Sequence, residues 1–184
     1  MTLLARYLVV GCWAIFFVYW LFHAFNVKQT IERQSIRSRL VVTIPTAVGF
    51  MLIVNSRGPR LIPSNDAAAW VIIAFALEGL AMTIWARRTL GRNWSANVNF
   101  KEGHELIRIG PYRFVRHPIY TGFLSMALAA AIVNSRSLAL VGFGFATLAF
   151  WYKLLQEEAL MARHFPQEYP AYKATVKRLI PWVL

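Results

Sequence analysis

Five long stretches without Lys or Arg dominate this sequence and limit what the chain can fold into. They are residues 7–25, 40–56, 67–86, 118–135 and 137–152, and only the third contains an acidic residue. About 20 apolar residues are needed to cross the hydrocarbon core of a bilayer as a helix. The pattern therefore predicts an all-α, polytopic membrane protein with about five transmembrane helices.

The last two stretches are predicted to form a helical hairpin. Only Arg136 separates them, and polar residues flank it on both sides, which is typical of a tight turn between two helices. The second helix of the hairpin is expected to run to about residue 155 and then to leave the membrane. With the first three spans, the hairpin gives a single membrane domain over residues 1–184.

The distribution of Lys and Arg predicts the orientation. Of the 20 basic residues, 16 lie in the regions after the first and third stretches or in the C-terminal tail, which face the same side of a five-span protein. Cytoplasmic loops carry the excess of Lys and Arg. We therefore expect the N-terminus outside, and a cytoplasmic loop over residues 88–117 and tail over 156–184. The short outer loops suit a prokaryotic inner membrane.

The net charge of +12 would suggest a nucleic-acid partner in a soluble protein. Here, however, 58% of the residues are hydrophobic and 15% are charged, against roughly 25% charged in a soluble domain. The basic residues lie between apolar stretches, so we expect membrane lipids and no nucleic acid as partners. The single cysteine, Cys12, excludes an intramolecular disulfide and a Cys-based zinc site, and no metal site is predicted. No sequence signal indicates an oligomeric state.

Candidate functional residues lie where the fourth stretch begins. Gly110 and Pro111 indicate a turn, and Pro118 suits the first turn of a helix, where its missing N–H costs nothing. His117 and Tyr120 are therefore expected at the cytoplasmic interface. There they are either anchors, as basic and aromatic residues at membrane edges commonly are, or part of a binding site.

Glu157 and Glu158 form a second cluster just beyond the fifth stretch, in a chain with only 8 acidic residues. Lys153 lies four residues before Glu157, so a solvated ion pair on a helix face is the simpler explanation for these acids taken alone. The hairpin, however, is expected to bring His117 and Tyr120 beside them. A carboxylate pair, an imidazole and an aromatic ring suit a small zwitterionic or cationic ligand such as S-adenosylmethionine.

From residue 91 onward, the sequence resembles the isoprenylcysteine carboxyl methyltransferase family and the related phospholipid methyltransferases. The motifs H-x-L, G-P-Y, R-H-P-x-Y-x-G and E-E follow one another in the family's order, and two tail motifs follow them. They occupy residues 104–107, 110–112, 116–122, 157–158, 165–173 and 178–181. The resemblance covers about half the chain, and the first three spans match the family only in hydropathy.

The resemblance implies S-adenosylmethionine as the methyl donor, bound in a cytoplasmic pocket, with S-adenosylhomocysteine as the product. Carried over by position, the cofactor-binding residues are Asn97, His104, Glu105, Leu106, Ile107, Tyr112, His117, Pro118, Ile119, Tyr120 and Glu157.

The resemblance also implies a site for the methyl acceptor. Lys153 stands where the family's eukaryotic carboxyl methyltransferases place an arginine in the lipid-substrate site; a lysine keeps the charge but lacks the bidentate fork. Lys153 and Glu158 are the catalytic candidates, with Glu158, like His117, available as a base for an amine acceptor. Glu78 and Trp94 join Lys153 as candidate substrate-binding residues. Glu78 is an acid at bilayer depth, which indicates either a functional site or a buried, hydrogen-bonded acid.

The predicted function is transfer of a methyl group to a lipophilic or prenylated acceptor that enters from the bilayer. The first choice of acceptor is the carboxylate of an isoprenylcysteine-like compound, and the alternative is the amine of a phospholipid. Outside catalysis, the alternatives are a membrane protein that binds lipids or assembles partners, and a small transporter. A transporter is less well supported, because many transporters contain internal repeats and this sequence shows no such repeat.

Overall fold

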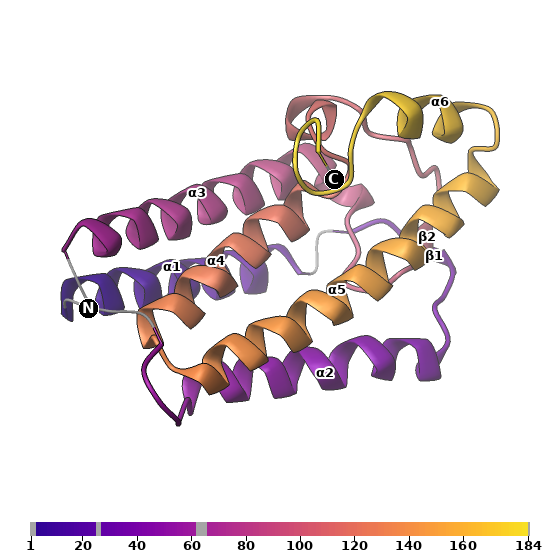
Figure 1. The fold of residues 1–184 in the computed structure, drawn as a ribbon. Helices are drawn as coiled ribbons and strands as arrows, with labels where there is room; N and C mark the ends of the chain where they lie inside the picture. Colours follow the sequence, from indigo (N-terminus) through magenta and orange to yellow (C-terminus); the bar gives the residue numbers. More distant parts are fainter. Residues whose placement is uncertain (1–2, 25–26, 62–65, 184) are drawn as a thin grey trace.

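The computed structural model describes residues 3–24, 27–61 and 66–183 and is mainly helical (Figure 1). A helix forms in each of the five apolar stretches, and a short one lies near the C-terminus. The helices are Leu3–His23 (α1), Ile36–Val54 (α2), Asp66–Leu90 (α3), Pro118–Asn134 (α4), Ser137–His164 (α5) and Glu168–Thr175 (α6). The expected end of the first stretch, Phe25, lies outside the described residues.

Four helices within the described ranges are long and apolar enough to cross a membrane: Leu3–His23, Ile36–Val54, Ala67–Asn93 and Ser137–His164. α4 is apolar but has only 17 residues. A helix of that length extends about 26 Å, somewhat less than a hydrocarbon core of roughly 30 Å. Pro118 sets its start, and Ser135, with a left-handed φ of 57°, ends it. The expected helical, membrane-type fold is confirmed; of the five expected spans, the structure supports four by length.

Two glycine contacts hold the long helices together in pairs. α3 packs along α4 and α2 packs along α5 (Figure 1). A Cβ added at Gly79 would lie 2.5 Å from the carbonyl oxygen of Gly122, and one added at Gly49 would lie 2.5 Å from that of Gly142. Small residues allow helix backbones in membranes to approach closely, so both crossings require glycine.

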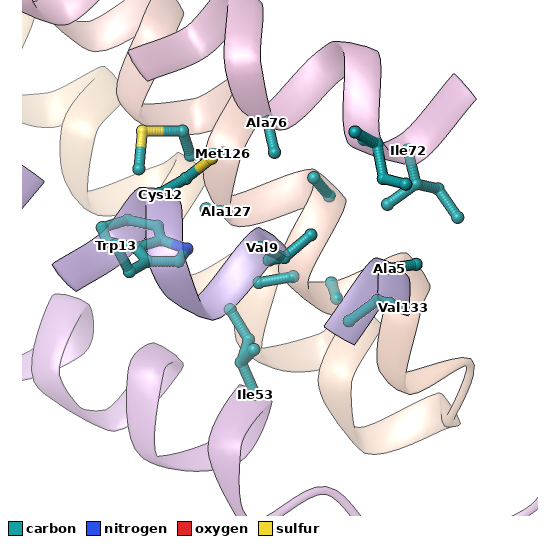
Figure 2. Close-up of a cluster of buried hydrophobic side chains, with 14 of the residues drawn as sticks. Ala5, Val9, Cys12, Trp13, Ile53, Ile72, Ala76, Met126, Ala127 and Val133 are labelled. Atoms are coloured by element: carbon teal, nitrogen blue, oxygen red, sulfur yellow. The ribbon is translucent and has the colours of Figure 1, made fainter. Parts of the chain in front are cut away.

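The apolar core lies between α1, α3 and α4, with α2 closing one side (Figure 2). Cys12 and Trp13 of α1 and Met126 of α4 are among its buried side chains. The Trp13 ring meets Phe50 of α2 and Phe123 of α4 edge-on, with centroids 4.8 and 5.2 Å apart. These aromatic contacts fix the position of α1 against the other helices.

Connections between the helices lie at both ends of the bundle. Ser135 and Arg136 alone join α4 to α5, which return in opposite directions as the predicted hairpin requires (Figure 1). At the other end of this hairpin lie α6, the short helices Gly91–Asn93 (η1) and Gly110–Arg113 (η2), and a small antiparallel sheet of Thr30–Glu32 (β1) and Phe100–Lys101 (β2). The sheet was not predicted, because strands of two or three residues have no recognisable alternation.

Candidate active site

A cavity of about 290 Å³ lies at the end of the bundle that carries α6 and the small sheet. The cavity is lined by α1, α4, α5, α6 and the last residue of α3, together with the segment between α3 and α4. Phe16, Trp20, Phe123 and Phe150 give it an aromatic wall, and Glu157 lies in its polar part. Its volume is near the lower limit of small-molecule sites, which range over about 300–1,000 Å³.

Most of the predicted site residues meet in this cavity. Of the predicted cofactor-binding residues, Pro118 alone does not line it; Pro118 is fully buried in the first turn of α4. Lys153 and Trp94 line the cavity as well. The predicted cofactor-binding residues that line it are Asn97, His104, Glu105, Leu106, Ile107, Tyr112, His117, Ile119, Tyr120 and Glu157. Their roles in binding stay predictions.

His117 and Tyr120 owe their positions to the start of α4. His117 is the N-cap residue, Pro118 begins the helix, and Tyr120 lies three residues after His117. The two rings are nearly parallel, with an interplanar angle of 1° and centroids 5.4 Å apart. The Tyr120 hydroxyl donates a hydrogen bond to the Glu157 carboxylate, and His117 Nδ1 lies 3.5 Å from Glu157 Oε2. The α4–α5 hairpin thus joins the two clusters, as expected.

Glu158 occupies a different environment from its neighbour Glu157. Arg116 donates two hydrogen bonds to Oε1 of Glu158, at 3.1 Å from Nε and 2.6 Å from Nη2. Arg178 donates from Nε to Oε1 and from Nη2 to Oε2, both at 3.1 Å. Consecutive residues on a helix point about 100° apart, so Glu157 reaches the cavity while Glu158 binds the C-terminal segment. Glu158, predicted as a catalytic residue, is not among the residues that line the cavity.

The two largely buried histidines His104 and His117 have opposite pKa shifts. Burial alone would lower the pKa of His117, but the carboxylates of Glu157 and Glu158 outweigh it and raise the pKa. Burial, followed by the charges of nearby basic residues, lowers the pKa of His104 to about 4. His104 is therefore neutral at pH 7, and its buried Nδ1 has no hydrogen-bond partner within the described residues.

Gln34 fastens the loop that forms one wall of the cavity. Its backbone N–H donates to Asn99 Oδ1 at 3.0 Å, and its Oε1 accepts from the N–H of Val98 at 3.2 Å. Its Nε2 donates to Ser38 Oγ at 2.9 Å and to Gln156 Oε1 at 2.7 Å. Gln34 therefore ties the loop to α2 and to the residue that precedes Glu157.

Lys153 also joins α5 to this loop. Its Nζ donates to the carbonyl oxygen of Ala96 at 2.8 Å and lies 5.2 Å from the centroid of the Tyr120 ring. The ammonium group therefore lies in the wall, beside the aromatic rings. This position would allow it to meet an anionic group inside the cavity.

Glu78 is not part of this cavity. It lies on the exposed side of α3, between the buried residues Ala76 and Leu80, and accepts a hydrogen bond of 3.2 Å from Ser125 Oγ. The buried face of α3 repeats every three or four residues, and Glu78 falls off that face. The expectation that Glu78 lines the acceptor cavity is therefore not supported by its position.

Sequence reasoning missed four residues that form or support the site. Phe16 and Trp20 line the cavity from α1, but the uniform apolarity of that stretch did not distinguish them from lipid-facing residues. Gln34 lies in a short segment without a recognisable motif. Arg178 lies within the tail motif of residues 178–181, but nothing in that motif indicates that it binds Glu158.

The structure thus has the features of a helical membrane protein with a partly aromatic, partly polar cavity at one end. The sequence model of the isoprenylcysteine carboxyl methyltransferase family matches residues 71–163. This match covers half of the chain and most of the motifs around the cavity. The chain belongs to the isoprenylcysteine carboxyl methyltransferase family.

Individual relatives are similar over part of their length. The "Probable protein-S-isoprenylcysteine O-methyltransferase" of Oryza sativa subsp. indica is 30% identical over 116 residues, which are 61% of this chain and 58% of that protein. The protein-S-isoprenylcysteine O-methyltransferase of Saccharomyces cerevisiae is 33% identical over 101 residues, 53% and 42% of the two chains. "Methanethiol S-methyltransferase 1" of Bradyrhizobium diazoefficiens is 37% identical over 71 residues, 39% and 24% of the two chains. The matches to the two isoprenylcysteine enzymes thus span about half the length of those proteins.

Proposed function

We propose that this chain is an integral membrane methyltransferase that uses S-adenosylmethionine and methylates a lipophilic acceptor. The observation that carries the proposal is the position of Glu157. Its carboxylate, held by Tyr120 and lying beside His117, reaches a cavity whose other wall is aromatic. One cavity therefore offers both an ionic site for a polar cofactor and an apolar surface for a lipid chain.

The residues of the polar part fit the chemistry of S-adenosylmethionine. The carboxylate of Glu157 suits an ammonium group, and the Tyr120 ring suits a cation or a purine. His104 contributes a buried Nδ1 that lacks a partner among the described residues, as expected of a group that a ligand satisfies. Residues 104–107 and Asn97 would complete the site from the loop.

S-adenosylmethionine supplies, when bound, an electrophilic methyl group on a sulfonium. The task of the protein is then to position the acceptor and to exclude water. Gln34 and Lys153 hold the loop that forms one wall of the cavity. A carboxylate acceptor needs no base, and the Lys153 ammonium would orient it.

An isoprenylcysteine-like carboxylate is the acceptor that this arrangement favours. The aromatic wall of Phe16, Trp20 and Phe123 suits a prenyl chain, and entry from the bilayer would keep that chain out of water. An amine acceptor would require a base. Glu158 is poorly placed for that task, because it lies outside the cavity and is bound by two arginines. Of the two proposed bases, only His117 lines the cavity.

Methylation of a thiol is the second candidate. The similarity to the Bradyrhizobium protein, whose name gives methanethiol as its acceptor, favours it. A thiolate, like a carboxylate, is an anion that Lys153 could orient. The two candidates differ in the size of the apolar group that the aromatic wall accommodates.

The expected topology belongs to the same proposal. We propose that residues 1–184 form one membrane domain, with the N-terminus outside and the cavity at the cytoplasmic face of a prokaryotic inner membrane. The excess of Lys and Arg on the loops at the cavity end supports this orientation.

A methyl-transfer assay with the purified protein tests the function. Radiolabelled S-adenosylmethionine is incubated with N-acetyl-S-farnesylcysteine, with an alkanethiol, or with phosphatidylethanolamine vesicles. We expect label in the farnesylcysteine ester, and at least a tenfold loss of rate in Lys153→Met with this acceptor. Transfer only to the thiol would establish the second candidate. No transfer to any acceptor, combined with no binding of S-adenosylhomocysteine, would favour a non-catalytic lipid-binding protein.

A further inference from the structure

A second pocket lies at the same end of the bundle and is separate from the proposed methyltransferase site. It has a volume of about 230 Å³ and is lined by Tyr19, His23, Arg87, Arg88, Gly91 and Arg92. None of these residues lines the larger cavity. The guanidinium of Arg87 packs 4.5 Å from the centroid of Trp94, which does line it, so the two pockets are neighbours.

The lining of this second pocket is basic and carries no counter-charge. Three of its six residues are arginines, and none is acidic. Elsewhere in the described structure, Arg108, Arg116, Arg163 and Arg178 form ion pairs with glutamates. Within the described residues, no such ion pair is found for the three arginines of the pocket. Their charge is therefore available to an anion.

Arg87 is held rigidly at the base of the pocket. It is only 3% exposed, and its Nη1 and Nη2 donate to the carbonyl oxygens of Gly91 and His23, both at 2.7 Å. Its Nε, however, has no hydrogen-bond partner among the described residues, and neither has the hydroxyl of Tyr19. Leaving a buried donor without an acceptor is costly. Two such donors at one pocket indicate that an acceptor is missing.

The position of the pocket indicates which acceptor it meets. α1 ends at His23 and α3 ends at Leu90, so the pocket lies where two of the membrane-length helices end. Lipid headgroups lie at this level, and anionic headgroups attract basic residues there. The planar guanidinium group matches the geometry of phosphate oxygens, and Arg is favoured wherever phosphate is recognised.

We propose that this pocket binds a phosphate group, presented by the headgroup of an anionic membrane lipid. Arg88 and Arg92, which are exposed, would form ion pairs with the phosphate. Arg87 Nε and the Tyr19 hydroxyl would donate hydrogen bonds to phosphate oxygens at the base of the pocket. The lipid would hold the ends of α1 and α3 together, next to Trp94, which lines the larger cavity. This inference does not depend on the methyltransferase activity.

Lipid-dependent thermal stability of the purified full-length protein in dodecylmaltoside tests the proposal. Phosphatidylglycerol, phosphatidylcholine or inorganic phosphate is added to the wild type, to Arg88→Gln/Arg92→Gln, and to a matched control, Arg57→Gln/Arg60→Gln. The control removes two exposed arginines from the opposite end of the bundle. Native mass spectrometry counts the bound lipid molecules in each sample.

We expect phosphatidylglycerol to raise the Tm of the wild type and of the control by several degrees. In Arg88→Gln/Arg92→Gln, this Tm shift should be at most half as large. If inorganic phosphate reproduces the shift and the same variant loses it, the site holds phosphate but takes it from solution. Equal losses in both double variants, or no shift in the wild type, would overturn the proposal. Arg92→Gln alone replaces the double variant if the latter does not fold. Binding of S-adenosylhomocysteine should be unchanged in all of them.

Discussion

Arg116 and Glu158 form an ion pair in which Nη2 lies 2.6 Å from Oε1, with the two side chains 5% and 6% exposed. The pair joins the residue before His117, at the start of α4, to the residue after Glu157, near the end of α5. Each residue of the pair thus has its neighbour in the cavity. This contact holds together the two site clusters, which are 40 positions apart in the sequence.

Removing the charge of Glu158 should destabilise the protein. Glu158→Gln leaves the buried guanidinium of Arg116, and the partly exposed one of Arg178, against a neutral group, and an uncompensated buried charge costs about 3–5 kcal/mol. We expect a fall of about 3 kcal/mol in the free energy of unfolding, measured by denaturant titration in detergent. Glu168→Gln is the control, because its pair with Arg108 is about half exposed and should matter little. Equal effects of the two variants would contradict the structural role of Glu158.

The crossing of α3 and α4 should not accept a larger residue. A Cβ at Gly122 would meet the backbone of Gly79 and lie 2.8 Å from Thr83 Cγ2. Overpacking of this kind costs about 1–3 kcal/mol, so Gly122→Ala should lower the thermal midpoint by several degrees. Gly144→Ala is the matched control, because nothing lies within 4 Å of its added Cβ. A Gly122→Ala protein as stable as this control would show that the helices cross elsewhere.

Gln34 should act as a positioning residue for the cavity loop. Gln34→Ala removes the side-chain bonds to Val98, Ser38 and Gln156, so the loop should lose its fixed position. We expect the affinity for S-adenosylhomocysteine to fall about three- to tenfold, which corresponds to the net contribution of one hydrogen bond, about 0.5–1.5 kcal/mol, because Gln34 acts on the ligand only through the loop. Limited proteolysis within residues 94–107 should become faster. Gln29→Ala, an exposed change nearby, should alter neither quantity; a similar loss in both variants would argue against a specific role.

His104 should make the protein sensitive to acid. Burial, then the charges of Lys28, His164 and Lys101, lower its pKa from 6.5 to about 4, with Glu105 acting in the opposite direction. Between about pH 4 and pH 6.5, the imidazole of His104 is therefore protonated in the unfolded chain but neutral in the folded protein. Stability should fall progressively as the pH falls from 6.5 towards 4. Thermal midpoints measured across this range should decline less steeply in His104→Gln, and parallel curves for the two proteins would refute the assignment.

The sequence predicts the elements of this fold better than their contacts. The apolar stretches locate all five long helices, and the polar tetrad around Arg136 locates the turn of the hairpin. The ends of α4 were also predicted closely, because Pro118 starts the helix and the polar residues around Arg136 end it; that this helix is shorter than the four membrane-length helices was not predicted. The glycine pairs that fix the crossings are long-range contacts, which periodicity within one helix cannot reveal.

The same distinction applies to the candidate site. Motif spacing and the hairpin predict that His117, Tyr120 and Glu157 meet, and the structure brings them together. The different environments of Glu157 and Glu158 depend on which face of α5 the C-terminal segment covers. That segment returns through backbone bonds of Arg116 and His117 to residues 177 and 178, and no local pattern predicts such a return. Glu78 was expected to line the acceptor cavity but lies on the exposed side of α3. An acidic residue within an apolar stretch indicates its depth in the bilayer but not which side of the helix faces the cavity.

Calorimetric titration of S-adenosylhomocysteine into the detergent-purified wild type, Glu157→Gln and Glu102→Gln tests the proposed cofactor site most directly. Glu102 is exposed and does not line the cavity, so its variant controls for the loss of one negative charge. We predict saturable binding in the wild type and in Glu102→Gln, and a loss of at least tenfold in affinity in Glu157→Gln. Equal affinities in the three proteins, or no binding by a folded wild type, would contradict the assignment of this cavity to the methyl donor.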